Sequence, residues 1–99
     1  MTIAVPDPRL LAAIAQKRLI SLRFKDAERV AEPHDYGIRG GRVTLLAWQL
    51  VPEAGWRWFE IERMSDLKML DRRFAGGRAV PSGKHHQWDV LFARVGSSK

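Results

Sequence analysis

The chain has 99 residues and a mass of 11.3 kDa, which limits it to a single domain with one modest hydrophobic core. It contains no cysteine, so disulfides, thiolate zinc ligands and a cysteine nucleophile are excluded. The net charge of +6 comes mostly from arginine and favours an anionic partner. The alternative explanation is an arginine-rich composition without functional meaning.

The first elements in the chain are a helix and two strands. Asp7 can cap a helix with Pro8 in its first turn, and the apolar residues within 7–18 recur at helical spacing. Alternating and branched side chains predict strands over residues 19–24 and 29–38. Pro33 predicts an edge position or a bulge in the second strand, and three glycines within 37–42 predict the turn that follows it.

The rest of the chain predicts shorter strands and a C-terminal extension. A near-continuous apolar segment predicts a strand over 43–51, and 56–62 alternates cleanly. A helical turn at 63–66 precedes a fifth strand over 67–71, and residues 75–86 have the composition of a loop. The apolar spacing in 85–95 favours a helix over a final strand. We therefore expect a mainly β fold with α: a small five-stranded barrel (core about 19–74) preceded by a helix and followed by a C-terminal helix or extension (75–99).

No pattern in the sequence specifies a catalytic or metal site. The Gly83-Lys84 pair lacks the flanking residues of a phosphate-binding loop, and no Gly-x-Ser-x-Gly elbow occurs. His34, His85 and His86 have no carboxylate nearby at metal-ligand spacing. We expect no enzymatic activity, no cofactor and no bound metal.

The sequence also predicts neither a membrane span nor a secretory signal. No apolar run approaches the roughly 20 residues that a membrane span needs. Residues 1–8 lack the basic and apolar segments of a secretory signal. The expected location is the cytoplasm, without membrane association.

Several short motifs occur in a fixed order along residues 10–74. They are Ala13-Ile14 in the helix, Phe24 at a strand end, Arg29 with Pro33 four residues on, the apolar strand 43–48, the segment 57–64, and Phe74. In this order they resemble the WYL domain, a small Sm-like or SH3-like barrel found mainly in bacterial transcription regulators. The resemblance implies a non-enzymatic module that senses a ligand or nucleic acid and takes part in transcription regulation.

The sequence departs from the family pattern at several positions. The naming triad Trp-Tyr-Leu is Val43-Thr44-Leu45 here, so only the leucine is retained. Glu60 stands where the family usually has a basic residue, and Glu62 replaces an aspartate. The family's usual N-terminal helix-turn-helix domain is missing, so we expect a stand-alone sensing module without its own promoter-reading part.

The candidate ligand site consists of arginines at a rim of the barrel. Arg57 and Arg63 flank the apolar middle of one strand, and Arg29 on a neighbouring strand could join one of them. His34 and Tyr36 share a face of the second strand and could stack or hydrogen-bond at the same rim. The expected partner is single-stranded nucleic acid, a nucleotide or another small anion. The alternative is that the arginines pair with nearby carboxylates and that Tyr36 is a core residue.

The tryptophans suggest a second class of function. Trp56 and Trp58 share the outward face of their strand, where they could cover the N-terminal helix, form a homodimer contact or stack on nucleobases. A protein-interaction or homo-oligomerisation module is therefore the alternative function. Trp88 is expected to anchor the C-terminal segment onto the barrel.

Overall fold

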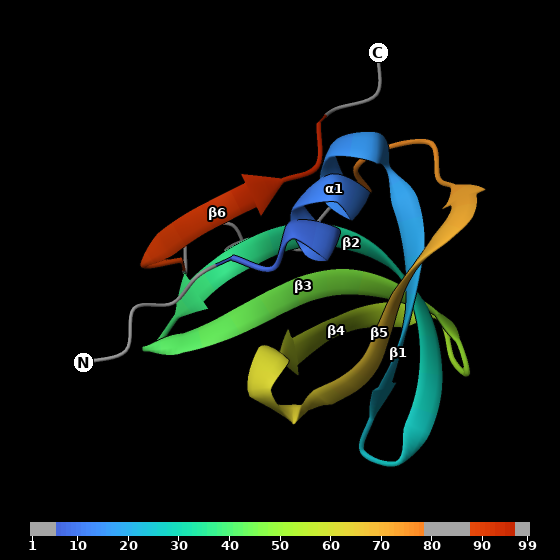
Figure 1. Cartoon of the computed structure of the whole chain (residues 1–99), viewed down its shortest axis with the longest axis horizontal. Helices are drawn as coiled ribbons and strands as arrows, with labels where there is room; N and C mark the ends of the chain where they lie inside the picture. Colours follow the sequence, from blue (N-terminus) through green and yellow to red (C-terminus); the bar gives the residue numbers. More distant parts are fainter. Residues whose placement is uncertain (1–5, 79–87, 97–99) are drawn as a thin grey trace.

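One helix and six strands make up the fold in the computed structural model, which describes residues 6–78 and 88–96 (Figure 1). The elements are α1 (Pro8–Gln16), β1 (Arg18–Phe24), β2 (Ala27–Arg39), β3 (Arg42–Val51), β4 (Gly55–Glu60), the 3₁₀ turn η1 (Ile61–Arg63), β5 (Met64–Arg73) and β6 (Val90–Arg94). The strands pair antiparallel in the order β4-β3-β2-β1-β5, and β6 pairs with β2. The prediction of a mainly β fold with a helix near the N-terminus is confirmed.

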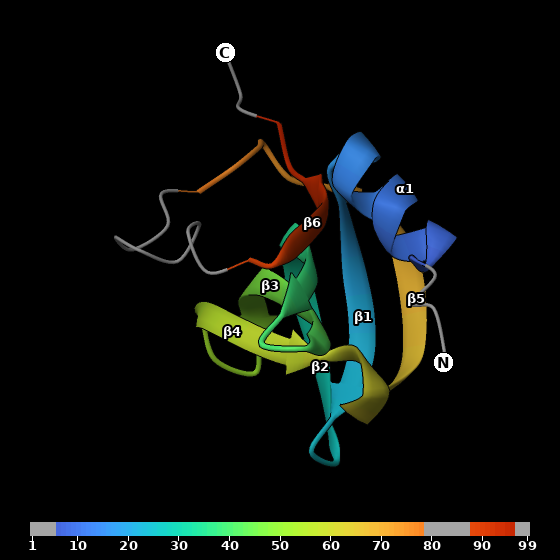
Figure 2. The ribbon, with the colours of Figure 1, turned by 90° about the vertical axis from the view of Figure 1, so that its left-hand side faces the viewer.

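The sheet curls strongly but does not close into a barrel (Figure 2). β4 and β5 lie at the two ends of the strand order, and no pairing between them occurs among the described residues. The turn η1 carries the chain from β4 to β5. The expected small barrel is therefore a curled, open sheet with one strand more than the sequence predicted.

Local chemistry explains why the first elements form where they do. The side chain of Asp7 accepts a hydrogen bond from the backbone N–H of Arg9 at 2.8 Å, which caps α1 as predicted. Gly40 and Gly41 connect β2 to β3 with φ angles of +58° and +78°. Glycine adopts these left-handed angles without steric cost, so a two-residue hairpin forms here.

β2 is the central strand, and it contacts three neighbours. Residues 27–31 pair with β1 and residues 35–38 pair with β6, while β3 pairs along most of the opposite edge. Pro33, which has no N–H to donate, lies between the two partners, and the register to β3 shifts between Pro33 and Asp35. The predicted bulge is confirmed. It reverses the alternation of side chains, so that His34 and Tyr36 lie on opposite faces of β2.

The helix predicted over 85–95 is wrong. Residues 90–94 form β6 against the edge of β2, and residues 85–87 lie outside the described part of the chain. The edge of β2 offers unpaired backbone N–H and C=O groups. A short apolar segment can pair its own backbone groups with them, so residues 90–94 form a strand rather than a helix. Gly37 permits the close approach, since a Cβ at this position would collide with the carbonyl oxygen of Val90.

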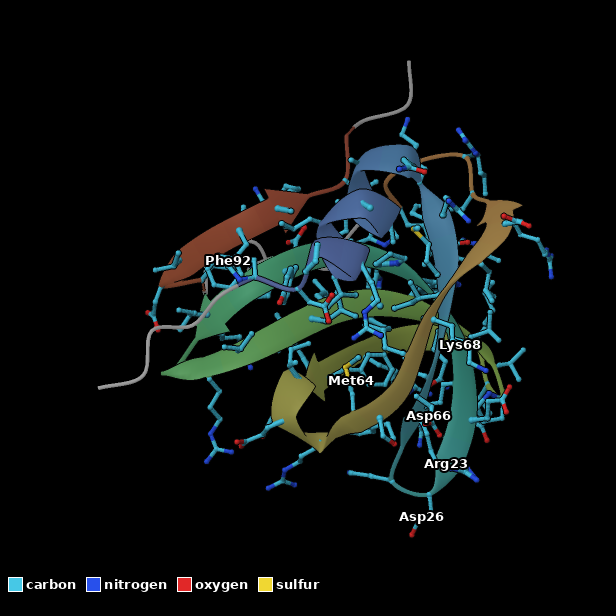
Figure 3. All side chains as sticks on the ribbon, viewed as in Figure 1. Arg23, Asp26, Met64, Asp66, Lys68 and Phe92 are labelled. Atoms are coloured by element: carbon cyan, nitrogen blue, oxygen red, sulfur yellow. The ribbon has the colours of Figure 1, made fainter. Side chains whose placement is uncertain are left out.

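The main core lies inside the curve of the sheet, beneath α1. The helix packs against β1, β2, β5 and β6 (Figures 1 and 2). The core residues are Leu10, Ala13, Ile14, Ile20, Leu22, Ala31, Tyr36, Leu45, Ala47, Phe59 and Val95. Charged side chains of β1 and β5 stay outside this core, as Figure 3 shows for Arg23, Asp66 and Lys68.

Candidate functional site

Arg29 is held in a half-buried position by neutral partners. Its Nε donates to the carbonyl oxygen of Phe24 at 3.2 Å, and its Nη1 donates to Oε1 of Gln49 at 2.9 Å. Gln49 is itself buried, and its Nε2 donates to the carbonyl oxygen of Glu53 at 2.8 Å. The guanidinium carbon of Arg29 also lies 5.5 Å from the centre of the Phe24 ring. These contacts orient the guanidinium group without neutralising its charge.

Arg57 lies on the same face of the sheet as Gln49. Gln49 pairs with Gly55, and Arg57 follows Gly55 by two residues along β4, so strand alternation places their side chains on one face. The Nη1 of Arg57 donates to the carbonyl oxygen of Trp56 at 2.9 Å. Across residues 6–78 and 88–96, neither Arg29 nor Arg57 forms an ion pair. The fold therefore brings two half-buried guanidinium groups without carboxylate partners to the same end of the sheet.

Arg63 is separate from these two arginines. It lies in η1 with its side chain 60% exposed, and its Nε is 3.4 Å from Oε2 of Glu60. The same carboxylate oxygen accepts a hydrogen bond from Nη1 of Arg42 at 2.9 Å. Arg63 thus pairs with a nearby carboxylate, as the alternative explanation proposed.

His34 is buried on the side of β2 that faces away from the main core. Its Nε2 accepts a hydrogen bond from the backbone N–H of Arg78 at 3.0 Å, and its Nδ1 lies 2.8 Å from the carbonyl oxygen of Glu32. The two partners assign the proton to Nδ1 and a neutral ring. The ring stacks on Phe74 and meets Trp56 edge-on. Burial lowers the pKa of His34, which favours the same neutral form.

Tyr36 faces the main core. Its hydroxyl oxygen accepts a hydrogen bond from the backbone N–H of Asp7 at 2.9 Å, and its ring meets Phe92 of β6 edge-on. Burial raises the pKa of the hydroxyl. The expectation that His34 and Tyr36 share a face is wrong, because the bulge after Pro33 lies between them.

Trp56 and Trp58 belong to a second aromatic cluster outside the main core. Trp56 meets Trp48 at a centroid distance of 5.5 Å, and Trp58 meets Trp88 at 5.6 Å. The guanidinium carbon of Arg39 lies 4.0 Å from the ring centre of Trp58. The expectation that these tryptophans cover the helix is wrong, because α1 packs against other strands. Trp88 does contact the sheet from the C-terminal segment, as expected.

Two buried carboxylates on β2 were not singled out from the sequence. Glu32 accepts two hydrogen bonds from Arg78 at 2.7 and 3.1 Å, and Asp35 accepts two from Arg94 at 3.2 and 3.3 Å. Both arginines come from the C-terminal third of the chain. The sequence does show an acidic residue on each side of His34 within a predicted strand, which could have indicated buried carboxylates. No neighbouring residue indicated that Arg78 and Arg94 would be their partners.

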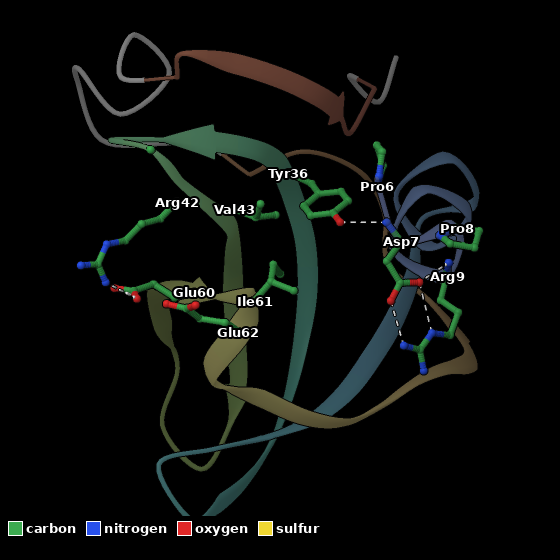
Figure 4. Close-up of a pocket in the computed structure, with 11 residues that line it drawn as sticks. Pro6, Asp7, Pro8, Arg9, Tyr36, Arg42, Val43, Glu60, Ile61 and Glu62 are labelled. Carbon is green, nitrogen blue, oxygen red and sulfur yellow. Dashed lines mark hydrogen bonds and ion pairs between the residues drawn. The ribbon is translucent and has the colours of Figure 1, made fainter. Parts of the chain in front are cut away.

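A pocket lies between the segment before α1 and the turn η1 (Figure 4). It has a volume of about 1010 Å³. Its walls are residues 6–9, Tyr36, residues 41–43 and residues 60–62. Of the predicted site residues, only Tyr36 lines it.

A second pocket of about 170 Å³ lies on the outer face of β1 and β5. Arg23, Glu28, Asp66 and Lys68 are among its lining residues, so it carries charges of both signs. It does not include any of the predicted site arginines.

Metal binding and membrane spanning each place a requirement on the described residues. These residues include no group of three or more His, Asp or Glu side chains that could hold a metal ion. Their helix is too short to cross a membrane. His85 and His86 lie outside the described residues.

A single helix packed on a curled, open sheet of six antiparallel strands defines a small, mainly β domain. The family model of the WYL domain matches residues 8–69, and the chain belongs to this family. WYL domains are regulatory and ligand-sensing modules, not a catalytic family. No curated protein and no solved structure matches the chain.

Proposed function

We propose that this WYL domain is a regulatory module that binds a phosphate-bearing ligand, either a nucleotide or single-stranded nucleic acid, through Arg29 and Arg57. One observation carries the proposal: the two half-buried guanidinium groups share a face and lack carboxylate partners among the described residues. A partly buried charge without a counter-charge is unfavourable. A bound anion would supply the missing counter-charge.

The hydrogen-bonding capacity of the two side chains supports the same ligand class. A guanidinium group carries five N–H donors. Arg29 uses its Nε and Nη1 on the protein, and Arg57 uses its Nη1, so each retains free donors. Planar arginine donors fit the oxygen atoms of phosphate groups, and the net charge of +6 would attract such ligands. We propose further that the domain takes part in transcription regulation and acts in the cytoplasm.

Fluorescence anisotropy with a labelled oligothymidylate, at low and moderate salt, tests the proposal. Arg29→Ala and Arg57→Ala should each weaken binding by about tenfold. Each should also make the dependence of log affinity on log salt concentration less steep, by the amount expected for about one lost phosphate contact. Arg72→Ala, which removes an exposed charge on β5, should leave affinity nearly unchanged. Competition with a nucleoside triphosphate distinguishes a nucleotide site from a nucleic-acid site. No binding of either ligand, or binding insensitive to both variants, would refute the proposal.

The oligomerisation alternative is tested with the same protein. Trp56 and Trp58 contact aromatic groups of their own chain, which leaves less of their surface for a partner. Light scattering gives the mass of the particle in solution. A dimer that Trp58→Ala dissociates, together with no affinity for phosphate-bearing ligands, would replace the proposed function with homo-oligomerisation.

A further inference from the structure

The pocket between α1 and η1 is distinct from the end of the sheet that holds Arg29 and Arg57. Neither arginine lines it. Its volume of about 1010 Å³ is at the upper end of the range for small-molecule sites. Figure 4 shows Tyr36 and Val43 between Asp7 and Arg9 on one side and Arg42 with Glu60 on the other.

The interior of the pocket is largely apolar. Val43, Ile61 and the ring of Tyr36 contribute to it, together with Pro6 and Pro8 from the segment that leads into α1. Val43 stands where the family's naming triad has a tryptophan. Valine is much smaller than tryptophan, and Val43 lines the pocket.

The charged side chains around the pocket are largely paired with one another. Arg9 binds both carboxylate oxygens of Asp7, with its Nη2 at 2.8 Å from Oδ2, and its Nη1 donates to the carbonyl oxygen of Leu67. Arg42 binds Glu60 at 2.9 Å. Each guanidinium is therefore already matched with a carboxylate, and neither is an uncompensated cation that would select an anionic ligand.

One buried polar group in the wall remains available to a ligand. The hydroxyl of Tyr36 accepts the N–H of Asp7, but its own proton has no acceptor in the described parts of the chain. Tyr36 lines the pocket although the residue is only 1% exposed, so this donor lies at the innermost wall. Buried hydroxyl donors are normally satisfied, and a ligand acceptor in the pocket would satisfy this one.

We propose that this pocket binds an uncharged, largely apolar small molecule that accepts a hydrogen bond from the hydroxyl of Tyr36. Pocket size and the apolar lining set the class of molecule. Arg9 and Arg42 are paired with carboxylates, and Glu62 lines the pocket without an ion pair among the described residues, so the lining disfavours an anionic ligand. The Tyr36 hydroxyl sets the position of one carbonyl, ether or ring-nitrogen acceptor. This site is independent of the proposed phosphate-binding function.

The uncharged naphthyl ketone prodan is a suitable probe, because its emission reports the polarity around its carbonyl group. We expect saturable binding with a blue-shifted emission, and weaker binding of the anionic probe anilinonaphthalene sulfonate. Val43→Trp should fill the pocket and weaken prodan binding by about tenfold or more. Val51→Trp is the matched control, because Val51 lies on the same strand, is 49% exposed and does not line the pocket.

Tyr36→Phe removes the hydroxyl and leaves the ring, so it tests the hydrogen bond without filling the pocket. It should weaken prodan binding several-fold and shift the emission of the bound probe further to the blue, because the carbonyl loses its donor. A purely structural role for Tyr36 would weaken binding without that shift and would refute the assigned hydrogen bond. Equal binding in Val43→Trp and the parent, tighter binding of the anionic probe, or loss of prodan binding in Arg29→Ala would each overturn the proposal.

Discussion

Arg78 forms a two-point ion pair with the buried carboxylate of Glu32, with N···O distances of 2.7 and 3.1 Å, although the two residues are 46 positions apart. The Glu32 side chain is 7% exposed, and that of Arg78 is 44% exposed. The guanidinium carbon of Arg78 also lies 4.7 Å from the ring centre of Trp48. These contacts hold the segment after β5 against β2.

Arg78→Ala should destabilise the domain by about 2 kcal/mol, because the buried Glu32 would lose its counter-charge. The expected loss is smaller than for a fully buried pair, since Arg78 is partly exposed. Urea unfolding followed by tryptophan fluorescence measures the change. Arg72→Ala, at an exposed position on β5, is the control and should change stability little. Glu32→Gln, combined with Arg78→Ala, should recover part of the lost free energy of unfolding, because it removes the unpaired charge. If it recovered none, loss of the ion pair would not be the cause of the destabilisation.

The stability of the domain should fall as the pH decreases below about 6.5, the pKa of an unperturbed histidine. Burial lowers the pKa of His34 in the folded state, despite the nearby carboxylates of Glu32 and Asp35. The unfolded chain therefore takes up a proton at a pH where the folded chain does not, and stability is lost until the folded-state pKa is reached. The Nε2 of His34 would also lose its role as acceptor for the Arg78 N–H.

Urea unfolding of the parent and of His34→Gln at several pH values between about 7.5 and 5 measures this contribution. The variant should show a shallower dependence on pH in this range, because glutamine does not titrate. His85 and His86 are present in both proteins and contribute equally. Identical pH dependences would show that His34 is not the group responsible.

Gly37→Ala should weaken the docking of β6. The added Cβ would meet the carbonyl oxygen of Val90 in the paired strand, so the two strands would have to separate. Overpacking of this kind costs about 1–3 kcal/mol. Hydrogen exchange should show faster exchange of the β6 amides, with β3 and β4 much less affected. Gly96→Ala is the control, because a Cβ there would meet no atom within 4 Å.

Lys17→Gly should stabilise the domain by roughly 0.5–1 kcal/mol. Lys17 ends α1 in a left-handed conformation with φ of +55°, which glycine adopts without steric cost. Ala15→Gly should have the opposite effect of about 1 kcal/mol, because Ala15 is an exposed residue inside the same helix. Thermal unfolding followed by circular dichroism compares the two variants. The same direction of change in both would contradict this account of the helix end.

Features that depend on neighbouring residues were predicted well. The Asp7 cap, the helix after it, the glycine turn and the bulge at Pro33 each follow from the chemistry of a few adjacent residues. The five predicted strands are present for the same reason, since their alternation is visible within short windows. Resemblance to the WYL domain, based on the order of short motifs, agrees with the family match.

Features that depend on distant residues were predicted poorly. The C-terminal apolar segment fits helical spacing, but the free edge of β2 makes it a strand. His34 and Tyr36 are two residues apart, yet the bulge between them sends one to the tryptophan cluster and the other to the core. The ion pairs of Glu32 and Asp35 join positions more than 40 residues apart and leave no local trace.

For the candidate site, the residue pattern alone indicated a basic β domain with arginines placed to meet an anion. Which of those arginines share a face was decided by strand pairing: Arg29 contacts Gln49, whose partner Gly55 precedes Arg57 by two positions, whereas Arg63 lies beside Glu60. The curl of the sheet created the pocket beside Tyr36. Short-range chemistry selects helices, turns and strands, whereas convergence of side chains requires the long-range pairing of strands that only the folded chain provides.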